Sequence, residues 1–416
     1  MRIKQLRVAN LRVFEQAEFE FRPGMNLLVG VNGVGKTTVL DALRICLSKI
    51  LPKVTPSRSR PLSFSGEDIR ANAKALTVNC TFELRGAEFT FLVHKQREES
   101  VVHKPGVVRE QTLDTPDIQE CQPELSTLPI QTKKVQKQPL GLFFSIRRSL
   151  VSDAAPSKTS ASGGQAGAFA DALTSRELRL ADMAYWMLAQ QALGSERLLA
   201  QKHIDALRHA AKRFLPYCKN LHAVSSPKPG LVVEKQGTVL DVRQLSDGER
   251  GLLALILDLA RRLSQANPTL ADPVKEGSAV VLLDELDLHL HPKWQRTIVE
   301  GLTSTFPNCQ FIGTTHSPQI VAAVEPEQVL LLTDMGVIRP DRTLGMDSNW
   351  ILRHLMEADD RPANAAKAIR EIEEQIKIGN FEKARAEIAT KRRVGLDLPE
   401  WAVLEARMGR MELLTE

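Results

Sequence analysis

Residues 2–9 alternate between apolar and polar side chains, which is the spacing of a strand with one buried face. A short apolar run at 25–30 stops at Gly30, and a glycine-rich stretch then leads into a segment with apolar residues at helical spacing. The pattern predicts a strand, a glycine turn and a helix in direct succession. Two further period-two stretches, 76–84 and 88–94, flank the turn LRGA and predict a hairpin.

Strand and helix patterns alternate through the second half of the chain. Helical patterns begin at the stretch LSDGER, near Pro292 and after Pro318. The strand-like segments are 231–235, 238–242, 279–284, 310–315 and 328–333. Because alternating strands and helices build parallel sheets covered by helices, the predicted fold class is α/β, with a mixed, largely parallel sheet flanked by helices.

Segments of another character lie between these halves. We expect a polar insertion at about 96–138 to be a long loop or partly disordered, because it has no sustained period. A linker rich in Ser, Ala and Gly at about 152–173 precedes a helical subdomain at about 174–220, which predicts two packed helices. Together with the alternating segments, they form a predicted head domain over residues 1–345.

Residues 346–416 predict a C-terminal helical region. Two charged amphipathic helices are expected at 364–378 and 381–392, joined at Gly379, and a third after Pro399. Charged helices of this kind are either simply solvated or offer a docking surface for a partner. The sequence leaves both interpretations open.

Composition excludes several classes of protein. No uncharged apolar run of about 18 residues is present, and the start MRIKQLRVANLRVFEQ alternates where a secretory signal would be apolar, so we expect a cytoplasmic protein that does not enter the membrane. The five cysteines form no C-x-x-C pair, which argues against a disulfide framework or a thiolate zinc site. The chain has 55 Lys and Arg residues against 50 Asp and Glu residues. This mild positive excess is compatible with nucleic-acid binding but does not require it.

The glycine turn has the spacing G-x-x-x-x-G-K-T. Gly30, Gly33 and Gly35 would let backbone N–H groups point inward around a phosphate. Lys36 can then reach the β- and γ-phosphate oxygens, and Thr37 can hold Mg²⁺. Since the motif stands where a strand meets a helix, it predicts a site for ATP with Mg²⁺.

The apolar run AVVLLDE ends in two carboxylates. At the end of a strand beside the phosphate loop, Asp284 is the expected metal partner, and Glu285 is the catalytic base that orients or deprotonates the attacking water. A transition-metal cage built from Asp284, Asp287, His289 and His291 is the alternative, and it would need facing side chains and softer ligands. Magnesium with ATP accounts for the stretch better.

Two further motifs follow the same order along the chain. Ser246 and Glu249 form an S-x-x-E capping box at a predicted helix start, and a capped, glycine-containing helix start also suits a terminal phosphate. His316, in TTHSP between a strand and a helix, is either a structural side chain or a sensor of the γ-phosphate. Because His316 occurs together with the other motifs, in this order along the chain, we favour the role of a γ-phosphate sensor.

In this order, GVNGVGKTT, LSDGER, VVLLDE, LDLHLH and TTHSP resemble motifs of the ATP-binding-cassette (ABC) class of P-loop ATPases, in the branch that contains RecF and the SMC proteins. They correspond to Walker A, the signature, Walker B, the D-loop and the H-loop. The resemblance implies an ABC-type ATPase head with a helical insertion and a C-terminal helical appendage. It also implies a homodimer or higher homo-oligomer, in which each ATP lies between Walker A of one subunit and the signature of the other.

The resemblance assigns a role to each motif residue. Nucleotide binding falls to Asn32, Gly33, Gly35, Lys36, Thr37 and Thr38, with Ser246 and Gly248 acting from the other subunit; Thr37 and Asp284 hold Mg²⁺, and Glu285 and His316 are catalytic.

Two departures from the family pattern stand out. Asp247 and Glu249 occupy signature positions where transporters have Gly and Gln, which adds negative charge near a phosphate. The stretch LGLFFSIRRSL lies where the Q-loop is expected but contains no glutamine, so Ser145 or Arg147 would have to substitute.

Longer stretches resemble the stand-alone bacterial ATPases of the Septu antiphage type, the PtuA-like family, which also occur with retrons. They are QLSDGERGLLALILDLARRLSQANP, LLDELDLHLHPKWQRTIVEGLTSTFPNCQFIGTTHSPQI and GMDSNWILRHLM. Members of that family work beside a separately encoded HNH nuclease. The resemblance therefore implies a slow, regulatory ATPase that gates such a nuclease in antiphage defence.

Two other functions compete with this one. A RecF-like repair ATPase would bind DNA across the head dimer, with Lys133, Lys134, Arg392 and Arg393 as candidate phosphate contacts. A transporter ATPase would need a membrane partner, and the acidic signature and the missing glutamine disfavour it.

Overall fold

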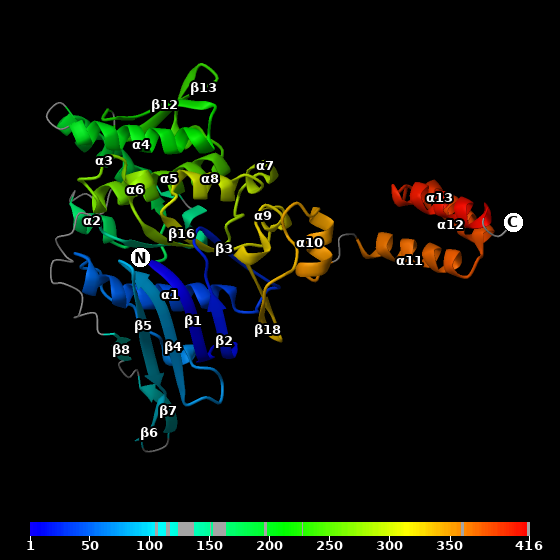
Figure 1. The fold of residues 1–416 in the computed structure, drawn as a ribbon, viewed down its shortest axis with the longest axis horizontal. Helices are drawn as coiled ribbons and strands as arrows, with labels where there is room; N and C mark the ends of the chain where they lie inside the picture. The colour runs from blue at the N-terminus through cyan, green and yellow to red at the C-terminus, as the bar shows by residue number, and fades with distance from the viewer. Residues whose placement is uncertain are drawn as a thin grey trace. The chain divides into compact units, whose positions relative to one another are not determined.

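A computed structural model describes residues 1–104, 107–113, 117–123, 137–149, 151–152, 164–194, 198–226, 228–358 and 362–413. The chain forms two compact units, Met1–Ile351 and Leu352–Glu416 (Figure 1).

A six-stranded sheet forms the centre of the first unit in these residues. Its strand order is β18-β17-β3-β16-β15-β9, and all neighbours are parallel except β18, which runs antiparallel to β17. The strands are β3 (Met25–Val29), β9 (Leu140–Phe144), β15 (Ala279–Leu283), β16 (Cys309–Thr314), β17 (Val329–Thr333) and β18 (Gly336–Ile338). The predicted α/β fold with a mixed, largely parallel sheet is confirmed.

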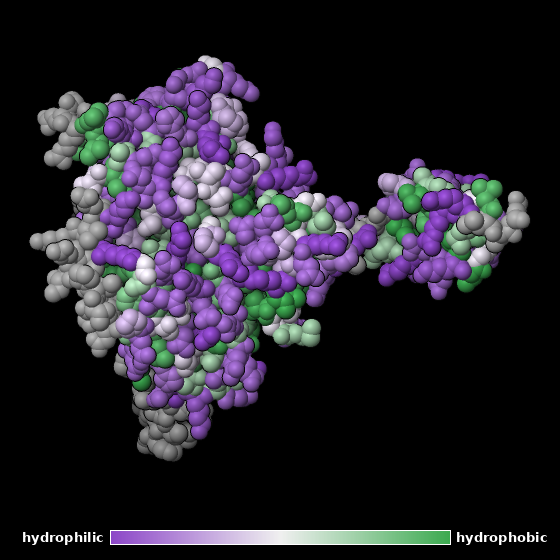
Figure 2. All heavy atoms as spheres, in the orientation of Figure 1, coloured by the Kyte–Doolittle hydropathy of each residue, from purple (hydrophilic) through white to green (hydrophobic). Residues whose placement is uncertain are grey.

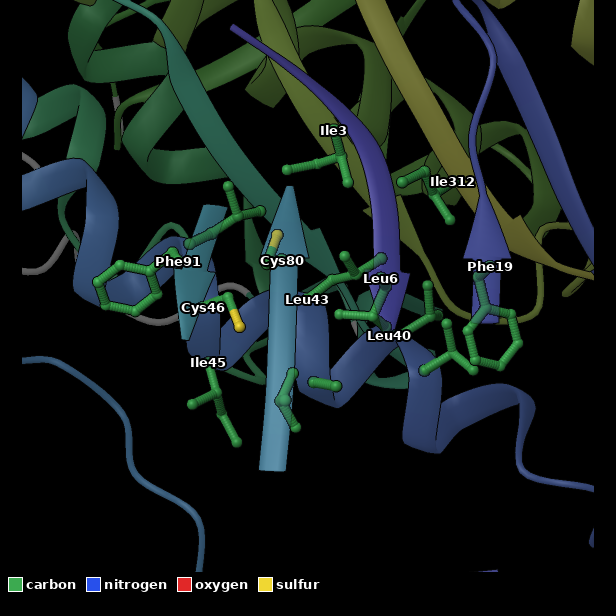
Figure 3. Close-up of a cluster of buried hydrophobic side chains, with 14 of the residues drawn as sticks. Ile3, Leu6, Phe19, Leu40, Leu43, Ile45, Cys46, Cys80, Phe91 and Ile312 are labelled. Atoms are coloured by element: carbon green, nitrogen blue, oxygen red, sulfur yellow. The ribbon is translucent and has the colours of Figure 1, made fainter. Parts of the chain in front are cut away.

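Helix α1 (Lys36–Val54) lies between this sheet and a second, antiparallel sheet of order β2-β1-β4-β5-β8. The strands of the second sheet are β1 (Arg2–Leu11), β2 (Phe14–Glu20), β4 (Ala75–Leu84), β5 (Ala87–Gln96) and β8 (Ile118–Gln122). Figure 3 shows Leu40, Leu43 and Cys46 of α1 among apolar side chains of β1, β4 and β5. The predicted hairpin is the β4–β5 pair, whose residues alternate between buried and half-buried along β4.

Helices cover the opposite face of the central sheet, with α5 nearest to it (Figure 1). The predicted helix pair is confirmed by α3 and α4, which pack against each other and beside a three-stranded sheet. The elements of this layer are α2 (Gln165–Phe169), α3 (Leu180–Gly194), α4 (Leu198–Phe214), β12 (Cys218–Val224), β13 (Gly230–Lys235), β14 (Thr238–Asp241), α5 (Asp247–Ala266), α6 (Pro273–Glu276) and α8 (Ile298–Thr305).

Shorter elements connect these layers. They are the 3-10 turns η1 (Gly66–Asp68), η4 (Ile146–Ser149), η5 (Val242–Gln244) and η6 (Pro326–Gln328), the helices α7 (Pro292–Gln295), α9 (Pro318–Val321) and α10 (Ser348–Leu355), and the paired strands β10 (Val151–Ser152) and β11 (Leu178–Arg179).

The expectation of an irregular insertion at about 96–138 is wrong in part. β6 (Glu98–Lys104) and β7 (Val107–Leu113) pair as a hairpin, and β8 adds to the antiparallel sheet beside β5. β8 is largely exposed, so its sequence lacks the alternation that a buried face imposes. Residues 124–136, which include Lys133 and Lys134, lie outside the described part.

The expected linker at about 152–173 also contains regular structure. Gly167, Ala168 and Phe169 of α2 are buried, and α2 packs against α5. A helix of five residues is too short to show a 3.6-residue period, which is why the sequence pattern missed it. Residues 153–163 of the expected linker are outside the described part.

Asp258 of α5 binds three arginines in the buried interior. Its carboxylate accepts hydrogen bonds from Arg261 at 2.7 Å, Arg262 at 2.9 Å and Arg176 at 2.6 Å. Arg262 also donates to the carbonyl oxygen of Ala168 at 2.6 Å, which ties α2 to α5. Although burial alone would raise it, the three guanidinium groups hold the pKa of Asp258 well below its usual value.

The second unit packs three helices around its own apolar core. α11 (Ala363–Lys377), α12 (Phe381–Arg393) and α13 (Glu400–Leu413) correspond to the helices expected from the sequence. The core residues are Ala368, Ile372, Ile376, Ala384, Ile388, Trp401, Leu404 and Met408. Arg392, one of the candidate DNA contacts, pairs with Asp397 and Glu405, so carboxylates of its own unit already engage it.

Within the described residues, no helix has both the length and the apolar character that crossing a membrane requires. All five cysteines are free thiols, as their spacing predicts.

We predict that Asp258→Asn lowers the free energy of unfolding by about 3–5 kcal/mol, because it leaves buried guanidinium groups without a counter-charge. Urea denaturation of the purified protein measures this. The matched control is Asp205→Asn, which breaks the more exposed pair between Asp205 and Arg208 on α4 and should cost about 1 kcal/mol or less. Equal effects of the two variants would contradict the prediction.

Candidate active site

The carboxyl ends of three neighbouring strands meet at one edge of the central sheet. The register pairs Leu28 of β3 with Thr314 of β16, and Leu283 of β15 with Gly313 of β16. The phosphate loop follows β3 and Asp284 follows β15, so Thr314 lies between them. Open α/β sheets bind their ligands at this kind of edge.

The phosphate loop is a glycine turn that ends where α1 begins. Gly35 has a left-handed backbone with φ of 100°, and a Cβ atom there would lie 2.5 Å from the Phe14 ring, so only glycine fits. Lys36 is buried, and its Nζ donates to the carbonyl oxygens of Gly30 and Val31 at 2.8 and 2.9 Å. A glycine turn at a helix N-terminus, with an ammonium group folded over it, fits a phosphate chain.

The other residues expected to bind nucleotide belong to the same loop and first helical turn. Asn32 and Gly33 are exposed in the loop, Thr37 is exposed at the start of α1, and Thr38 is buried beneath it. Their individual roles remain predictions.

Asp284 and Thr37, the expected metal-binding pair, are brought together. The Asp284 carboxylate is buried, and its Oδ1 lies 3.4 Å from Thr37 Oγ1 and accepts a 2.9 Å hydrogen bond from Thr314 Oγ1. The Thr314 hydroxyl in turn accepts from the backbone N–H of Glu285 at 2.7 Å. Thr314 therefore fixes both acidic residues, a role that the motif TTHSP alone did not indicate.

Glu285 has a left-handed backbone, with φ of 50°. That conformation costs a residue with a Cβ roughly 1–2 kcal/mol, so the surroundings must hold it. Its N–H is bonded to Thr314, and its carbonyl oxygen accepts from the N–H of Leu288 at 2.9 Å. The half-buried side chain is thereby displayed at the edge of the sheet beside Asp284.

Arg148 contacts the same turn from the other side. Its buried guanidinium donates to the backbone carbonyl oxygens of Asp284 and Glu285 and, at 3.3 Å, to that of Ser145. Burial lowers the pKa of Arg148 to about 10, against the opposing field of the nearby carboxylates. The neighbouring Arg147 is exposed, and the expectation that it or Ser145 substitutes for the Q-loop glutamine stays a prediction.

Lys36 and Arg148 act on the same three carboxylates. Burial lowers the pKa of Lys36, and the charges of Asp284, Glu285 and Asp287 oppose that shift, as they do for Arg148. The three carboxylates therefore lie close enough to both cations to interact with each of them.

Asp287 positions the stretch that carries His316. Its Oδ1 accepts from Thr315 Oγ1 at 2.6 Å and from the backbone N–H of His316 at 3.1 Å. The His316 side chain is exposed. His291 caps α7, where its Nδ1 accepts from the N–H of Lys293 at 3.2 Å. Nowhere in the described part do three or more His, Cys, Asp or Glu side chains gather to hold a metal ion, so the alternative transition-metal cage is not assembled.

The predicted capping box at the start of α5 is confirmed. Ser246 Oγ donates to Glu249 Oε2 at 2.8 Å, and the N–H of Ser246 donates to the same oxygen at 3.0 Å. Glu249 also accepts from Lys235 at 2.7 Å and from Tyr217. Although burial alone would raise it, these bonds hold the pKa of Glu249 at about 2. The carboxylate expected near a phosphate is thus neutralised within its own chain.

Glycine is required at position 248 because the backbone of another segment approaches it closely. A Cβ atom at this position would lie 2.5 Å from the carbonyl oxygen of His289, so the signature start abuts the D-loop of the same chain. The phosphate contacts that the resemblance implies for Ser246 and Gly248, made from a second subunit, remain predictions.

The chain is similar to known ATPases over most of its length. The model of the family described as "AAA domain, putative AbiEii toxin, Type IV TA system" matches residues 25–322. The retron Ec83 probable ATPase of Escherichia coli is 26% identical, over 87% of this chain and 77% of its own. The Septu protein PtuA of Bacillus thuringiensis is 23% identical, over 92% of this chain and 91% of its own. The predicted kinship with PtuA-like P-loop ATPases is confirmed.

Solved structures similar to the chain include a RecF protein and an SMC head domain. The recombination mediator protein RecF of the RecFOR pathway gives a TM-score of 0.45 at 14% identity, over 81% of this chain and 97% of its own. The SMC head domain from Thermotoga maritima gives 0.42 at 14% identity, over 82% and 100%.

The ionised Glu249 should stabilise the fold in a pH-dependent way. Because its folded pKa of about 2 lies below the ordinary 4.5, its contribution is complete above pH 4.5 and is lost as the pH falls through about 2. We expect Glu249→Gln to lower the free energy of unfolding by roughly 2 kcal/mol at pH 7, and by progressively less between pH 4.5 and 2. Urea titrations at pH 7, 4 and 3 measure the difference.

Asp247→Asn is the matched control in the same helical turn. Its carboxylate is 77% exposed in a pair with Arg250, so the change should matter little at any pH. A Glu249→Gln deficit that grows as the pH falls would contradict the assignment.

Proposed function

The chain belongs to this AAA-domain family, and from that membership we propose that it is the ATP-hydrolysing subunit of a bacterial antiphage defence system, closing as a head dimer to regulate a separately encoded HNH nuclease. Its ATPase activity follows from the family match and from the ATPase relatives. The observation that carries the site assignment is the convergence of Lys36, the Thr37–Asp284 pair and Glu285 at one sheet edge.

The residues at this edge suit a nucleoside triphosphate. The glycine turn would bind the phosphates through backbone N–H groups, and Lys36 would exchange its loop carbonyls for phosphate oxygens. Thr37 and Asp284 present a hydroxyl and a carboxylate oxygen, which are the ligands that Mg²⁺ prefers. The metal would neutralise charge on the phosphates during transfer.

Glu285 is the residue best placed to act on the attacking water. Its carboxylate follows the metal-binding Asp284 directly, and its backbone is fixed on both sides by hydrogen bonds. A held carboxylate can orient a water and accept its proton. His316 follows the next strand, with its N–H bonded to Asp287, and its exposed ring is available to a terminal phosphate.

The proposal of a dimer is based on the features of the start of α5. Ser246 is exposed at the positive end of a 20-residue helix, and the neighbouring Glu249 is already paired within the chain. Such a helix start suits the terminal phosphate bound by a second copy. The sandwich would thus complete each site with Ser246 and Gly248 of the neighbouring subunit.

The proposal of an HNH partner is based on kinship with the PtuA-like family. The three helices of the second unit carry their own core and an exposed charged surface, which suits docking of a partner chain. Purification of the complex from its native host, followed by identification of the co-eluting chains, tests this step. A small HNH protein is the expected companion, and recovery with DNA alone would favour the RecF-like alternative.

We predict that Glu285→Gln traps ATP and shifts the protein from monomer to dimer. Light scattering after size exclusion, with and without ATP and Mg²⁺, measures the shift. Adding Lys36→Ala to the same variant should abolish nucleotide binding and with it the shift. A dimer that forms equally with and without Lys36, or no dimer in either variant, would count against the sandwich.

A basic surface on α4 favours the second candidate, a RecF-like ATPase that binds nucleic acid. This α4 surface consists of Arg208, His209, Lys212 and Arg213 of α4 and Lys219 of the adjoining strand β12, all exposed except the half-buried Arg208. It lies in the mainly hydrophilic region over α4 in Figure 2. Successive turns of a helix bring such residues about 6 Å apart along its axis, so several phosphates of one strand would be met at once.

Two concavities adjoin the α4 surface and share His209 and Lys212 in their linings. Their volumes are about 520 and 440 Å³. In the described part of the chain, the first lining contains no carboxylate, and the second contains Asp272 alone. A hollow whose charged side chains are mainly basic favours a polyanion over an apolar ligand with a single acid group.

Reversing three charges tests nucleic-acid binding. We expect Lys212→Glu combined with Arg213→Glu and Lys219→Glu to weaken binding of a labelled duplex or single strand, and to flatten the dependence of log affinity on log salt by roughly 0.7–0.9 per lost contact. Fluorescence anisotropy at several salt concentrations measures this. Basal ATPase activity should stay unchanged.

The control is Arg392→Glu with Arg393→Glu in the second unit. Because Arg392 already pairs with carboxylates, this double variant should leave the salt dependence unchanged. If it flattens the dependence while the α4 variant does not, DNA binds at the second unit instead. If an acidic protein, but no nucleic acid, binds the α4 surface, the second candidate function fails.

A further inference from the structure

Arg148 reaches the catalytic turn although it lies 136 positions before it in the chain. It follows β9, which pairs in parallel with β15, so that Phe144 lies opposite Leu283. The N–H of Asp284 donates to the Phe144 carbonyl oxygen at 2.9 Å, which extends the pairing one residue beyond the strand. The η4 turn then directs the Arg148 side chain back under the carbonyl groups of Asp284 and Glu285.

We propose that Arg148 is a positioning residue for ATP hydrolysis: its guanidinium fork holds the left-handed turn at Glu285 and so aims the catalytic carboxylate. The proposal rests on the proposed function in one respect, which is the assignment of Glu285 as the base. Within the described residues, the hydrogen bonds of Arg148 go to the backbone oxygens of Asp284, Glu285 and Ser145, so we infer that it acts through Glu285.

The two peptide groups that flank Glu285 are held separately. Thr314 binds the N–H of Glu285, and this bond holds the peptide group before Glu285 but not the one after it. Arg148 and the N–H of Leu288 bind that carbonyl oxygen. A residue with a Cβ leaves the left-handed region when it can, so loss of the fork would let the turn relax and the carboxylate swing away.

Arg148 also links the helical layer to the turn at Asp284 and Glu285 through a chain of hydrogen bonds. Ser145 accepts from Arg148 through its carbonyl oxygen, and its hydroxyl accepts from Ser175 Oγ at 2.9 Å. The next residue, Arg176, is bound to Asp258 of α5. Displacement of the segment around Ser175 would therefore move the anchor of the guanidinium, and with it Glu285.

Two substitutions separate the planar geometry of the Arg148 guanidinium from its positive charge. Arg148→Lys retains the charge but cannot donate to both carbonyl oxygens in one plane. Arg148→Gln removes the charge as well.

We expect Arg148→Gln to lower kcat for ATP hydrolysis about 10- to 100-fold, with KM for ATP changed less than about threefold, because a misplacement of about 1 Å has effects of this size. Arg148→Lys should lose a similar factor in kcat, because it keeps the charge but not the planar fork. Combining Arg148→Gln with Glu285→Gln should reduce the rate no further than Glu285→Gln alone.

Arg60→Gln is the control, because Arg60 is an exposed arginine beyond the C-terminal end of α1, whose N-terminal end forms the candidate site. It should leave kcat and KM unchanged. Melting temperature and the affinity for a fluorescent ATP analogue report folding, and Arg148→Lys decides the question if Arg148→Gln does not fold. Arg148 variants that hydrolyse ATP as fast as Arg60→Gln, or that lower the rate further in the Glu285→Gln background, would overturn the proposal. Full activity of Glu285→Gln would instead overturn the proposed function.

Discussion

The parallel register of β3, β16 and β15 is the constraint on which the whole site depends. It places Thr314 level with the ends of both neighbouring strands, where one hydroxyl can bond to the Asp284 carboxylate and to the N–H of Glu285. A slip of one residue would turn Thr314 to the other face of the sheet and separate the phosphate loop from its acidic partners. All three strands are buried, and the Asn26 side chain of β3 helps to fix the register by donating to the carbonyl oxygen of Phe311 on β16 at 3.3 Å.

Charge balance is the second requirement of this edge. Three carboxylates within four positions would repel one another if they were left alone. Lys36 lies on the phosphate-loop side and Arg148 on the β9 side, and each is desolvated enough for its field to act at short range. The acidic turn is therefore already stabilised by the protein's own cations, so the proposed metal ion would complete the balance rather than supply all of it.

The sequence predicts those parts of the site that depend on neighbours along the chain. The glycine turn, the strand ending in Asp284 and Glu285, and the capping box of Ser246 all have short-range signatures. Contacts across long separations could not be predicted in the same way. Nothing in the doublet Arg147–Arg148 shows which side chain turns inward, because that depends on the pairing of β9 with β15.

The same limit explains the other differences between sequence and structure. β8 and α2 lack a readable period because one is exposed and the other spans only five residues. Glu249 raised the expectation of a repulsive charge near a phosphate, but Lys235 on β13 neutralises it. In the proposed dimer, Ser246 would redirect its hydroxyl proton from Glu249 to a phosphate oxygen, while its N–H and Lys235 keep their bonds to that carboxylate. In that proposed closure one hydrogen bond would replace another, so the cap would limit how tightly the start of α5 binds a phosphate.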